Sequence, residues 1–237
     1  NIAIGLEALF TNTTGAQLVA VGGGALNANT TAANNLAIGY SALNDNTTGT
    51  RNIAVGNYVL DSCTTGGSYN VGVGYAAGDA VTTAQNCVLI GDVTGDAITT
   101  SSNCTAVGSS ALTTHATGSG NTAIGKSALG SCTNGANTAV GMDAGTNVTT
   151  GYNNTFVGDD AGDTVTTGAN NTCIGINCNP SAATGSQQIV VGIDIDGIGD
   201  NYTTLGYSGE GRIYNQFSAN ASWTRASDVR LKKEIAD

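Results

Sequence analysis

Hydrophobic and polar positions alternate in short stretches that recur about every 17 residues along most of the chain. Examples are Asn-Ile-Ala-Val-Gly at 52–56, Asn-Thr-Ala-Ile-Gly at 121–125 and Asn-Thr-Phe-Val-Gly at 154–158. The glycines of these stretches follow one another in steps of 16 to 18 residues, at twelve positions: Gly5, Gly22, Gly39, Gly56, Gly74, Gly91, Gly108, Gly125, Gly141, Gly158, Gly175 and Gly192. Because one such repeat cannot bury an apolar face alone, the period predicts an all-β, parallel β-solenoid in which each repeat is one coil.

The alternation inside each stretch predicts a short strand with two different faces. The residue before the glycine is always Ile or Val, and the residue two positions earlier is β-branched or Leu, as in Ile2 and Ile4. We expect these two positions to fill the coil interior, since residues two apart share one face of a strand. The residue between them is usually Ala, such as Ala3 or Ala123, and we expect it to point outward and permit close approach by another chain.

A second part of the repeat keeps one bulky aliphatic residue in each coil. Where the fourth residue after the glycine is Leu, the seventh is polar or small, as in Leu129 and Cys132. Where the fourth residue is Gly, the seventh is Val or Ile, as in Gly145 and Val148. Close-packed interiors tolerate neither voids nor excess volume, so this exchange predicts that both aliphatic positions lie in the core.

Polar positions repeat with the same period. Asn precedes the strand in most coils, for example Asn52 and Asn154, which predicts ladders of side-chain amides from coil to coil. A pair of Thr residues, such as Thr13 and Thr14, follows the aliphatic position in most coils.

Composition and charge narrow the class of protein further. Of 237 residues, 35 are Gly and one is Pro, with 10% charged and 40% hydrophobic residues, which favours an ordered repetitive fold over disorder. The net charge is −10, and residues 1–210 hold 14 acidic residues against only Arg51 and Lys126. A nucleic acid or an anionic membrane needs a basic face, so we expect neither as a partner. The chain has no apolar run long enough for membrane insertion and no signal peptide, and it begins inside a repeat, as a piece of a longer protein would.

The repeated form Asn-x-Ala-Ile-Gly resembles the head repeats of trimeric autotransporter adhesins of the YadA type and of related phage tail fibres. The resemblance covers about residues 1–196 and implies a left-handed parallel β-roll in a homotrimer, with the Ala-bearing sheets around the threefold axis. The coils of that family are a few residues shorter, so its cross-section is not carried over.

Beyond Gly192 the period stops and aromatic residues become frequent. Residues 197–226 contain Tyr202, Tyr207, Tyr214, Phe217 and Trp223. We interpret this segment as a trimeric β neck, with a strand over 212–224, that caps the last coil. Such a cap is needed because a solenoid end exposes its core and its strand edges.

The stretch Ser-Asp-Val-Arg-Leu-Lys-Lys-Glu-Ile at 227–235 resembles the start of the intramolecular chaperone domain of phage tail fibres and tailspikes. In that family the domain helps three chains to trimerise and in many members then cleaves itself off. The resemblance implies that Ser227 is the nucleophile and Lys232 its base, with Asp228 and Arg230 completing the motif. Such a Ser hydroxyl needs a nearby base, which a Lys with a depressed pKa can supply. Since residues 227–237 are only the first part of such a domain, we expect no enzyme activity from this chain.

Several other residues could bind a metal or form a disulfide, but each also has a purely structural interpretation. Cys87 and Cys104 occupy the same place in adjacent coils, where they would form either a disulfide or two buried thiols. The alternating carboxylates Asp194, Asp196 and Asp200 suggest either a calcium loop or an acidic turn that closes the last coil. His115 shares its slot with Asn and Cys in other coils, which favours a structural role. We expect no cofactor.

Three functions remain open at this point. The first is a structural and receptor-binding segment of a trimeric bacteriophage tail fibre, located in the virion, which attaches to a host-surface receptor such as a glycan. The second is the head of a bacterial trimeric adhesin at the cell surface, which the stretch at 227–235 disfavours. The third is an ice-binding solenoid, suggested by the Thr pairs. No groove-lining cluster of aromatic residues or paired carboxylates stands out in the repeats, so a glycan-cleaving site is not indicated.

Overall fold

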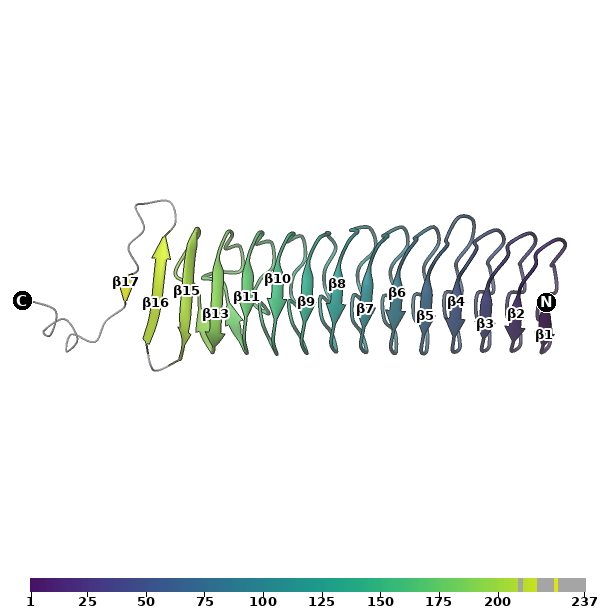
Figure 1. The fold of residues 1–237 in the computed structure, drawn as a ribbon, viewed down its shortest axis with the longest axis horizontal. Helices are drawn as coiled ribbons and strands as arrows, with labels where there is room; N and C mark the ends of the chain where they lie inside the picture. Colours follow the sequence, from purple (N-terminus) through teal and green to yellow (C-terminus); the bar gives the residue numbers. More distant parts are fainter. Residues whose placement is uncertain (209–210, 217–223, 226–237) are drawn as a thin grey trace, which may run out of the picture.

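In the computed structural model the described residues, 1–208, 211–216 and 224–225, form a parallel β-solenoid of about twelve turns with coils of about 17 residues (Figure 1). One strand from each coil joins a single sheet of fifteen strands, and a separate pair forms a second sheet. The strands are β1 (Ile2–Ile4), β2 (Val19–Val21), β3 (Leu36–Ile38), β4 (Ile53–Val55), β5 (Val71–Val73), β6 (Val88–Ile90), β7 (Thr105–Val107), β8 (Thr122–Ile124), β9 (Thr138–Val140), β10 (Thr155–Val157), β11 (Thr172–Ile174), β12 (Cys178–Asn179), β13 (Ile189–Ile193), β14 (Ile195–Asp196), β15 (Tyr202–Tyr207), β16 (Gly211–Gln216) and β17 (Thr224–Arg225).

Equivalent residues of successive coils stack directly on one another. Ala20 of β2, for example, pairs with Ala3 of β1 and with Ala37 of β3. Backbone hydrogen bonds between coils continue outside the strands, as from the Leu9 N–H to the Ala25 carbonyl at 3.0 Å. The backbone N–H and C=O groups of each coil thus find many of their hydrogen-bond partners in the neighbouring coil. Because these bonds need equivalent residues to stack, the repeat length is nearly constant.

The two strand faces are the reverse of what the alternation predicts. The middle residues of the strands are fully buried, including Ala20, Ala37 and Ala54, whereas Ile38 and Ile124 beside the repeat glycine are 39% and 40% exposed. The prediction that Ile and Val line the interior and Ala faces outward was therefore wrong. The interior already contains the Leu four residues after the glycine and the Ala before it, so only a small residue fits on the strand that faces them.

The predicted exchange of aliphatic positions is confirmed. Leu26, Leu43, Leu60, Leu112 and Leu129 are fully buried, and so are Val81, Ile98, Val148 and Val165 in the coils that carry Gly at the fourth position. Two of those coils also place a large residue on the strand itself. Phe156 and Leu89 are fully buried where most coils have Ala.

Glycine at the fourth position makes room for these large side chains. A Cβ at Gly145 would lie 2.8 Å from the Phe156 ring, and a Cβ at Gly78 would lie 2.6 Å from Leu89. Both distances are too short for carbon atoms in contact. The coils with Gly at the fourth position therefore form pairs in which one large strand residue fills the space of both.

The repeat glycine itself is required by conformation and by space. Gly5 has φ 134°, and a Cβ there would lie 2.5 Å from the carbonyl oxygen of Gly22 in the next coil. Any side chain at this position would force adjacent coils apart. This explains why glycine recurs at this position in all twelve coils, whereas the flanking residues vary.

The C-terminal part continues the stack before it reverses. Strand β15 pairs in parallel with β13, Gly206 opposite Gly192, so that parallel stacking extends beyond residue 196. Strands β16 and β17 then add in antiparallel orientation, within the predicted neck at 197–226. Ser227, Asp228, Arg230 and Lys232, with the whole segment 227–237, lie outside the described residues.

Candidate functional site

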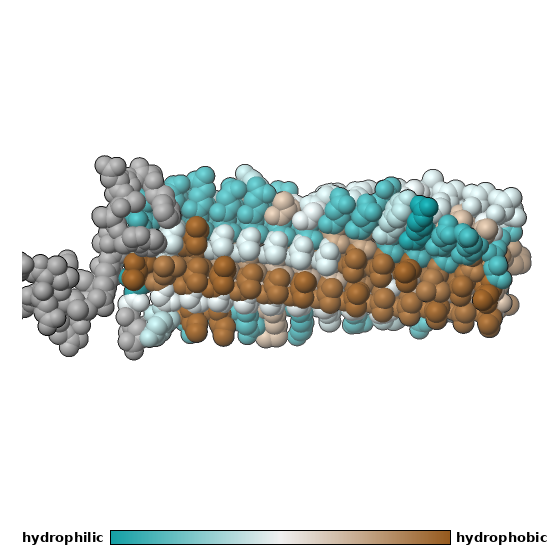
Figure 2. All heavy atoms as spheres, viewed as in Figure 1, coloured by the Kyte–Doolittle hydropathy of each residue, from teal (hydrophilic) through white to brown (hydrophobic). Residues whose placement is uncertain are grey.

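The outer side of the long sheet presents two rows of side chains, which we call the strand face. One row is the Ile or Val before each repeat glycine, and the other is the residue two positions earlier. Figure 2 shows the first row as an apolar band along the described rod. Ile53, Ile174 and Ile189 within these rows are 40%, 42% and 41% exposed. Apolar surface this continuous is typical of an interaction site.

The second row of the strand face changes character along the rod. It is apolar over β1 to β6, from Ile2 to Val88, and consists of Thr over β7 to β11. The five threonines are Thr105, Thr122, Thr138, Thr155 and Thr172, which pair in register from strand to strand. In Figure 2 they form the pale row next to the apolar band.

Three exposed tyrosines form a ladder at the corner that follows β3, β4 and β5. The ring centroids of Tyr40 and Tyr58 are 5.4 Å apart, and those of Tyr58 and Tyr75 are 5.9 Å apart, with the rings edge to face. The sequence alone does not identify this ladder, which lies on an exposed corner. Its sequence signal is slight, since these residues occupy the first or second position after the repeat glycine in three successive coils.

A row of carboxylates occurs in two of these coils and in the coil that follows them. Asp61, Asp79 and Asp96 occupy the fifth position after successive repeat glycines. Burial, together with the charges of Asp79 and Asp45, raises the pKa of Asp61 to about 6. Burial also raises the pKa values of Asp79 and Asp96. The row is thus harder to ionise than isolated surface carboxyl groups.

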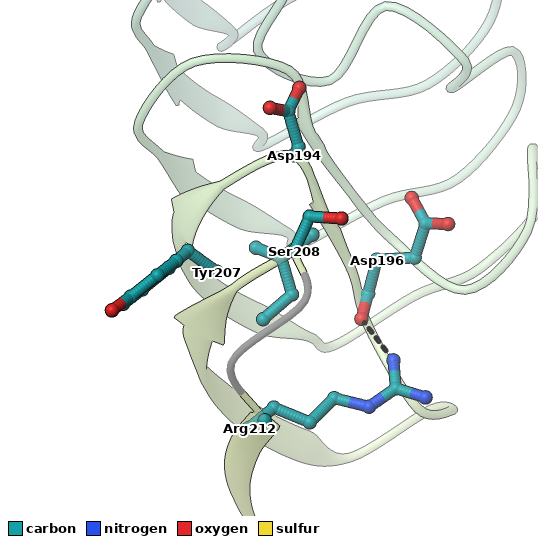
Figure 3. Close-up of a pocket in the computed structure, with 7 residues that line it drawn as sticks. Asp194, Asp196, Tyr207, Ser208 and Arg212 are labelled. Carbon is teal, nitrogen blue, oxygen red and sulfur yellow. Dashed lines mark hydrogen bonds between the residues drawn. The ribbon is translucent and has the colours of Figure 1, made fainter.

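A cavity of about 240 Å³ lies near the C-terminal end of the solenoid, between the β13–β14 turn and the β15–β16 hairpin (Figure 3). Its lining includes Asp194, Asp196, Tyr207, Ser208 and Arg212. The Arg212 guanidinium donates a hydrogen bond to the Asp196 carbonyl oxygen at 3.1 Å. That bond joins the Arg212 side chain to a backbone oxygen and not to the Asp196 carboxylate.

Two of the three carboxylates considered as a calcium loop have separate hydrogen-bond partners. Asp194 accepts a hydrogen bond from the Asn177 amide at 2.9 Å, and Asp200 accepts one from the Ser186 N–H at 2.8 Å. Across residues 1–208, 211–216 and 224–225, no three His, Cys, Asp or Glu side chains come together as metal ligands. Asp194 and Asp196 both line the cavity, but Asp200 does not join them to form a three-ligand calcium site.

His115 is fully buried in the core. Its Nδ1 lies 3.1 Å from the Cys132 carbonyl oxygen, and its Nε2 contacts the Gly118 carbonyl oxygen and lies 3.1 Å from the Asn121 amide nitrogen. Burial acts to lower the pKa of His115, but hydrogen bonds with Cys104, Cys132 and the Gly118 carbonyl raise it to about 10. These contacts give the imidazole a structural place between coils.

All six cysteines are buried thiols: Cys63, Cys87, Cys104, Cys132, Cys173 and Cys178. Burial raises the pKa of Cys63 to about 12, which makes it unreactive. Cys87 and Cys104 lie in adjacent coils as expected, each just before the paired residues Val88 and Thr105. The Cys87 thiol donates to the Ser101 carbonyl at 3.3 Å, and the pair is not joined in this structure.

Together these features define a parallel β-solenoid with one long, partly apolar strand face and a short tyrosine ladder at its edge. No model of a known protein family, no curated protein and no solved structure matches the chain. Within the described ranges, the structure holds no helix with the length and apolar character of a membrane span.

Proposed function

We propose that this chain is a shaft segment of a homotrimeric bacteriophage tail fibre that attaches the virion to a receptor on the host surface. The observation that carries the proposal is the strand face, which repeats with one spacing along the described rod. A partner that covers such a face along its length must have the same spacing. A second and a third copy of this chain, in parallel and in register, meet that requirement directly.

The energetics favour contact along the whole rod. Full burial of an Ile or Val side chain contributes about 1.5–3 kcal/mol. Covering the exposed two fifths of one such residue in each of about twelve coils would contribute on the order of 10 kcal/mol per protomer. The entropy cost of association is of similar size, so contact over a few coils would not hold the protomers together.

The proposed trimer differs from the family expectation in the surface it uses. Because Ala20, Ala37 and Ala54 are inside the coil, the Ile, Val and Thr rows would surround the threefold axis. The narrow sheet suits this arrangement, since β1 to β11 are each three residues long and present two rows. Each protomer can then pack one row against each of its two neighbours.

The stretch at 227–235 supports the tail-fibre assignment over a bacterial surface adhesin, through its resemblance to the start of a chaperone domain. We propose that three chains assemble with the help of such a domain, and that Ser227 and Lys232 carry out one cleavage in the longer protein. The segment itself would act as a rigid spacer and binding surface, and not as an enzyme.

Sedimentation velocity or mass photometry of the purified chain tests the assembly. The expected particle has three times the chain mass of 23.4 kDa, about 70 kDa. Ile38→Asp combined with Ile124→Asp should give monomers, because both side chains lie exposed on the strand face and a carboxylate there would be buried unpaired. A stable monomer of the unaltered chain would refute the proposal.

The control is Asn147→Asp, which adds one negative charge, half of that added by the double Ile variant, at an exposed position away from the strand face. This variant should remain trimeric. If it dissociates as fully as the double Ile variant, net charge rather than the strand face controls assembly.

Ice binding is a second candidate because of the Thr row, and not because of the Thr pairs. Thr105, Thr122, Thr138, Thr155 and Thr172 are aligned beside an aliphatic row on a regular sheet, which is an ordered array of hydroxyl and methyl groups. Thermal hysteresis of the purified chain tests it. Freezing-point depression well above that of an equal concentration of albumin would favour ice binding over the fibre role.

A further inference from the structure

We propose that Tyr40, Tyr58 and Tyr75 form a binding site for a neutral, linear oligosaccharide. The proposal deepens the receptor-binding role proposed above and rests on it, since it assigns that role to one surface of the rod. The three rings lie on adjacent coils at the corner that follows β3, β4 and β5.

Packing of the coils does not require aromatic residues at this corner. Tyr40 and Tyr75 are the first residues after their repeat glycines, where the other coils carry residues as different as Asn57, Asp92 and Lys126. Tyr40 and Tyr75 are 55% and 53% exposed, and Tyr58 is 38% exposed. A tyrosine that the fold does not need, and that remains accessible, is available for recognition.

The rings are held in place before any ligand arrives. Each outer ring contacts Tyr58 edge to face at 5.4 or 5.9 Å. The Tyr40 ring also lies over Gly23, where an added Cβ would come within 3.4 Å of it. Rings that are already ordered lose little conformational entropy on binding.

The chemistry of this corner suits a sugar. The faces of aromatic rings carry partial negative charge, which attracts the C–H groups on the face of a pyranose. Within the described part of the chain, the hydroxyl groups of Tyr40, Tyr58 and Tyr75 have no hydrogen-bond partner, unlike that of Tyr69, which accepts a hydrogen bond from Arg51 at 2.6 Å. The free hydroxyls can therefore bond to sugar hydroxyls.

Charge around the ladder favours a neutral glycan over an acidic one. Asp92 occupies the first position after the repeat glycine in the coil next to Tyr75. The segment from residue 1 to 210 holds 14 acidic and two basic residues. An anionic polysaccharide would be repelled by this field, whereas a neutral one would not.

The shape of the ladder favours a linear chain over a single sugar. The three rings follow the axis of the rod, one per coil, and adjacent strands of a sheet are about 4.8 Å apart. Successive units of an extended oligosaccharide could then each meet one ring. A short oligomer should therefore bind more tightly than the monosaccharide.

The test is binding of the purified protein to a printed array of neutral and acidic bacterial-surface oligosaccharides. The altered protein carries Tyr40→Asn, Tyr58→Ser and Tyr75→Asn, residues that Asn57 and Ser41 already supply at these positions of other coils. We expect binding to at least one neutral oligosaccharide, and at least a tenfold loss of affinity in the triple variant. Tyr152→Ala, at an exposed tyrosine outside the ladder, should retain it.

Sedimentation of the same samples separates this proposal from the proposed fibre role. A trimeric triple variant that has lost glycan binding supports the glycan site. Equal binding by the triple variant, binding of acidic glycans alone, or no glycan binding by a trimeric protein would overturn it. Loss of the trimer in the triple variant would also overturn it, because the ladder would then be a contact between protomers.

Discussion

The side-chain carbonyl of Asn154 accepts a hydrogen bond from the backbone N–H of Asn171, one coil further along the chain, at 2.9 Å. The amide group of Asn154 donates to the carbonyl of Gly168 in the same next coil, also at 2.9 Å. Asn35, Asn52, Asn70 and Asn137 have the same two kinds of partner. The predicted amide ladder thus exists, but it joins side chains chiefly to backbone groups rather than to one another.

Replacing Asn154 by Ala should destabilise the solenoid by about 2–4 kcal/mol. The change leaves two buried backbone groups unpaired, each of which costs about 1–3 kcal/mol. Urea unfolding followed by circular dichroism measures the loss. Asn147→Ala is the control, because the side chain of the exposed Asn147 makes one hydrogen bond among the described residues, to the Asp163 carbonyl. Equal losses in the two variants would mean that the buried ladder has no special role.

Phe156 and Gly162 should be energetically coupled. Phe156→Ala removes a fully buried ring and should cost about 3–5 kcal/mol. Gly162→Leu alone should also be destabilising, because a side chain there meets the Phe156 ring and the glycine has φ 68°. The double variant restores the combination of Ala on the strand and Leu at the fourth position found in other coils, so the aliphatic volume is partly restored.

Thermal unfolding of both single variants and the double variant measures this coupling. The double variant should be at least about 1 kcal/mol more stable than the sum of the single effects predicts. Gly199→Ala, where a new Cβ would come no closer than 3.7 Å to the Tyr202 ring, should be near neutral. Strict additivity would show that the two positions do not share one space.

Stability should fall as pH rises through the titration of Asp61. The pKa of this carboxyl is raised from 3.8 to about 6 in the folded chain, so the unfolded chain loses its proton first. The stabilisation is full below about pH 4 and is lost as pH rises through 6. Asp61→Asn removes the penalty and should raise stability at pH 8 by about 1 kcal/mol, a value reduced for partial solvent exposure.

Urea midpoints at pH 4 and pH 8 measure this difference. The Asp61→Asn variant and the unaltered chain should have similar midpoints at pH 4. Asp92→Asn, at an exposed carboxyl outside the row, should show no comparable gain at pH 8. A gain of the same size in both variants would assign the effect to net charge.

The thiols should be unreactive until the solenoid unfolds. All six are buried, so an aromatic disulfide reagent at pH 8 should label fewer than one per chain within minutes. In guanidinium chloride all six should react. A count of four in the unfolded chain would indicate one disulfide, and mass mapping would show whether it joins Cys87 to Cys104.

The coil count and the aliphatic exchange could be predicted because they depend on contacts between equivalent positions. Gly5 must be glycine because the carbonyl of Gly22 occupies the space of a Cβ on it, and Gly22 is constrained in the same way by the carbonyl of Gly39. Leu129 in one coil and Val148 in the next each supply the one bulky aliphatic side chain at these two positions of their coil. Such constraints recur in every coil and therefore appear directly as a period.

The strand faces were assigned wrongly because the alternation of residue types along a strand is compatible with either face pointing inward. It shows that Ala123 and Ile124 point in opposite directions, but not which of them points inward. The tyrosine ladder was missed for a different reason. Tyr58 is the second residue after its glycine and Tyr40 and Tyr75 are the first, so only the side-chain directions bring the three rings together.

The sequence by itself determined the parallel β-solenoid, its coil length and the positions that form its aliphatic core. The tertiary structure alone decided which strand face is exposed, and with it which surface is available to partners. The physical reason is the limited volume inside a 17-residue coil. Once the Leu or Val of the opposite wall is in place, there is room on the strand for Ala, and the Ile and Val residues must lie outside.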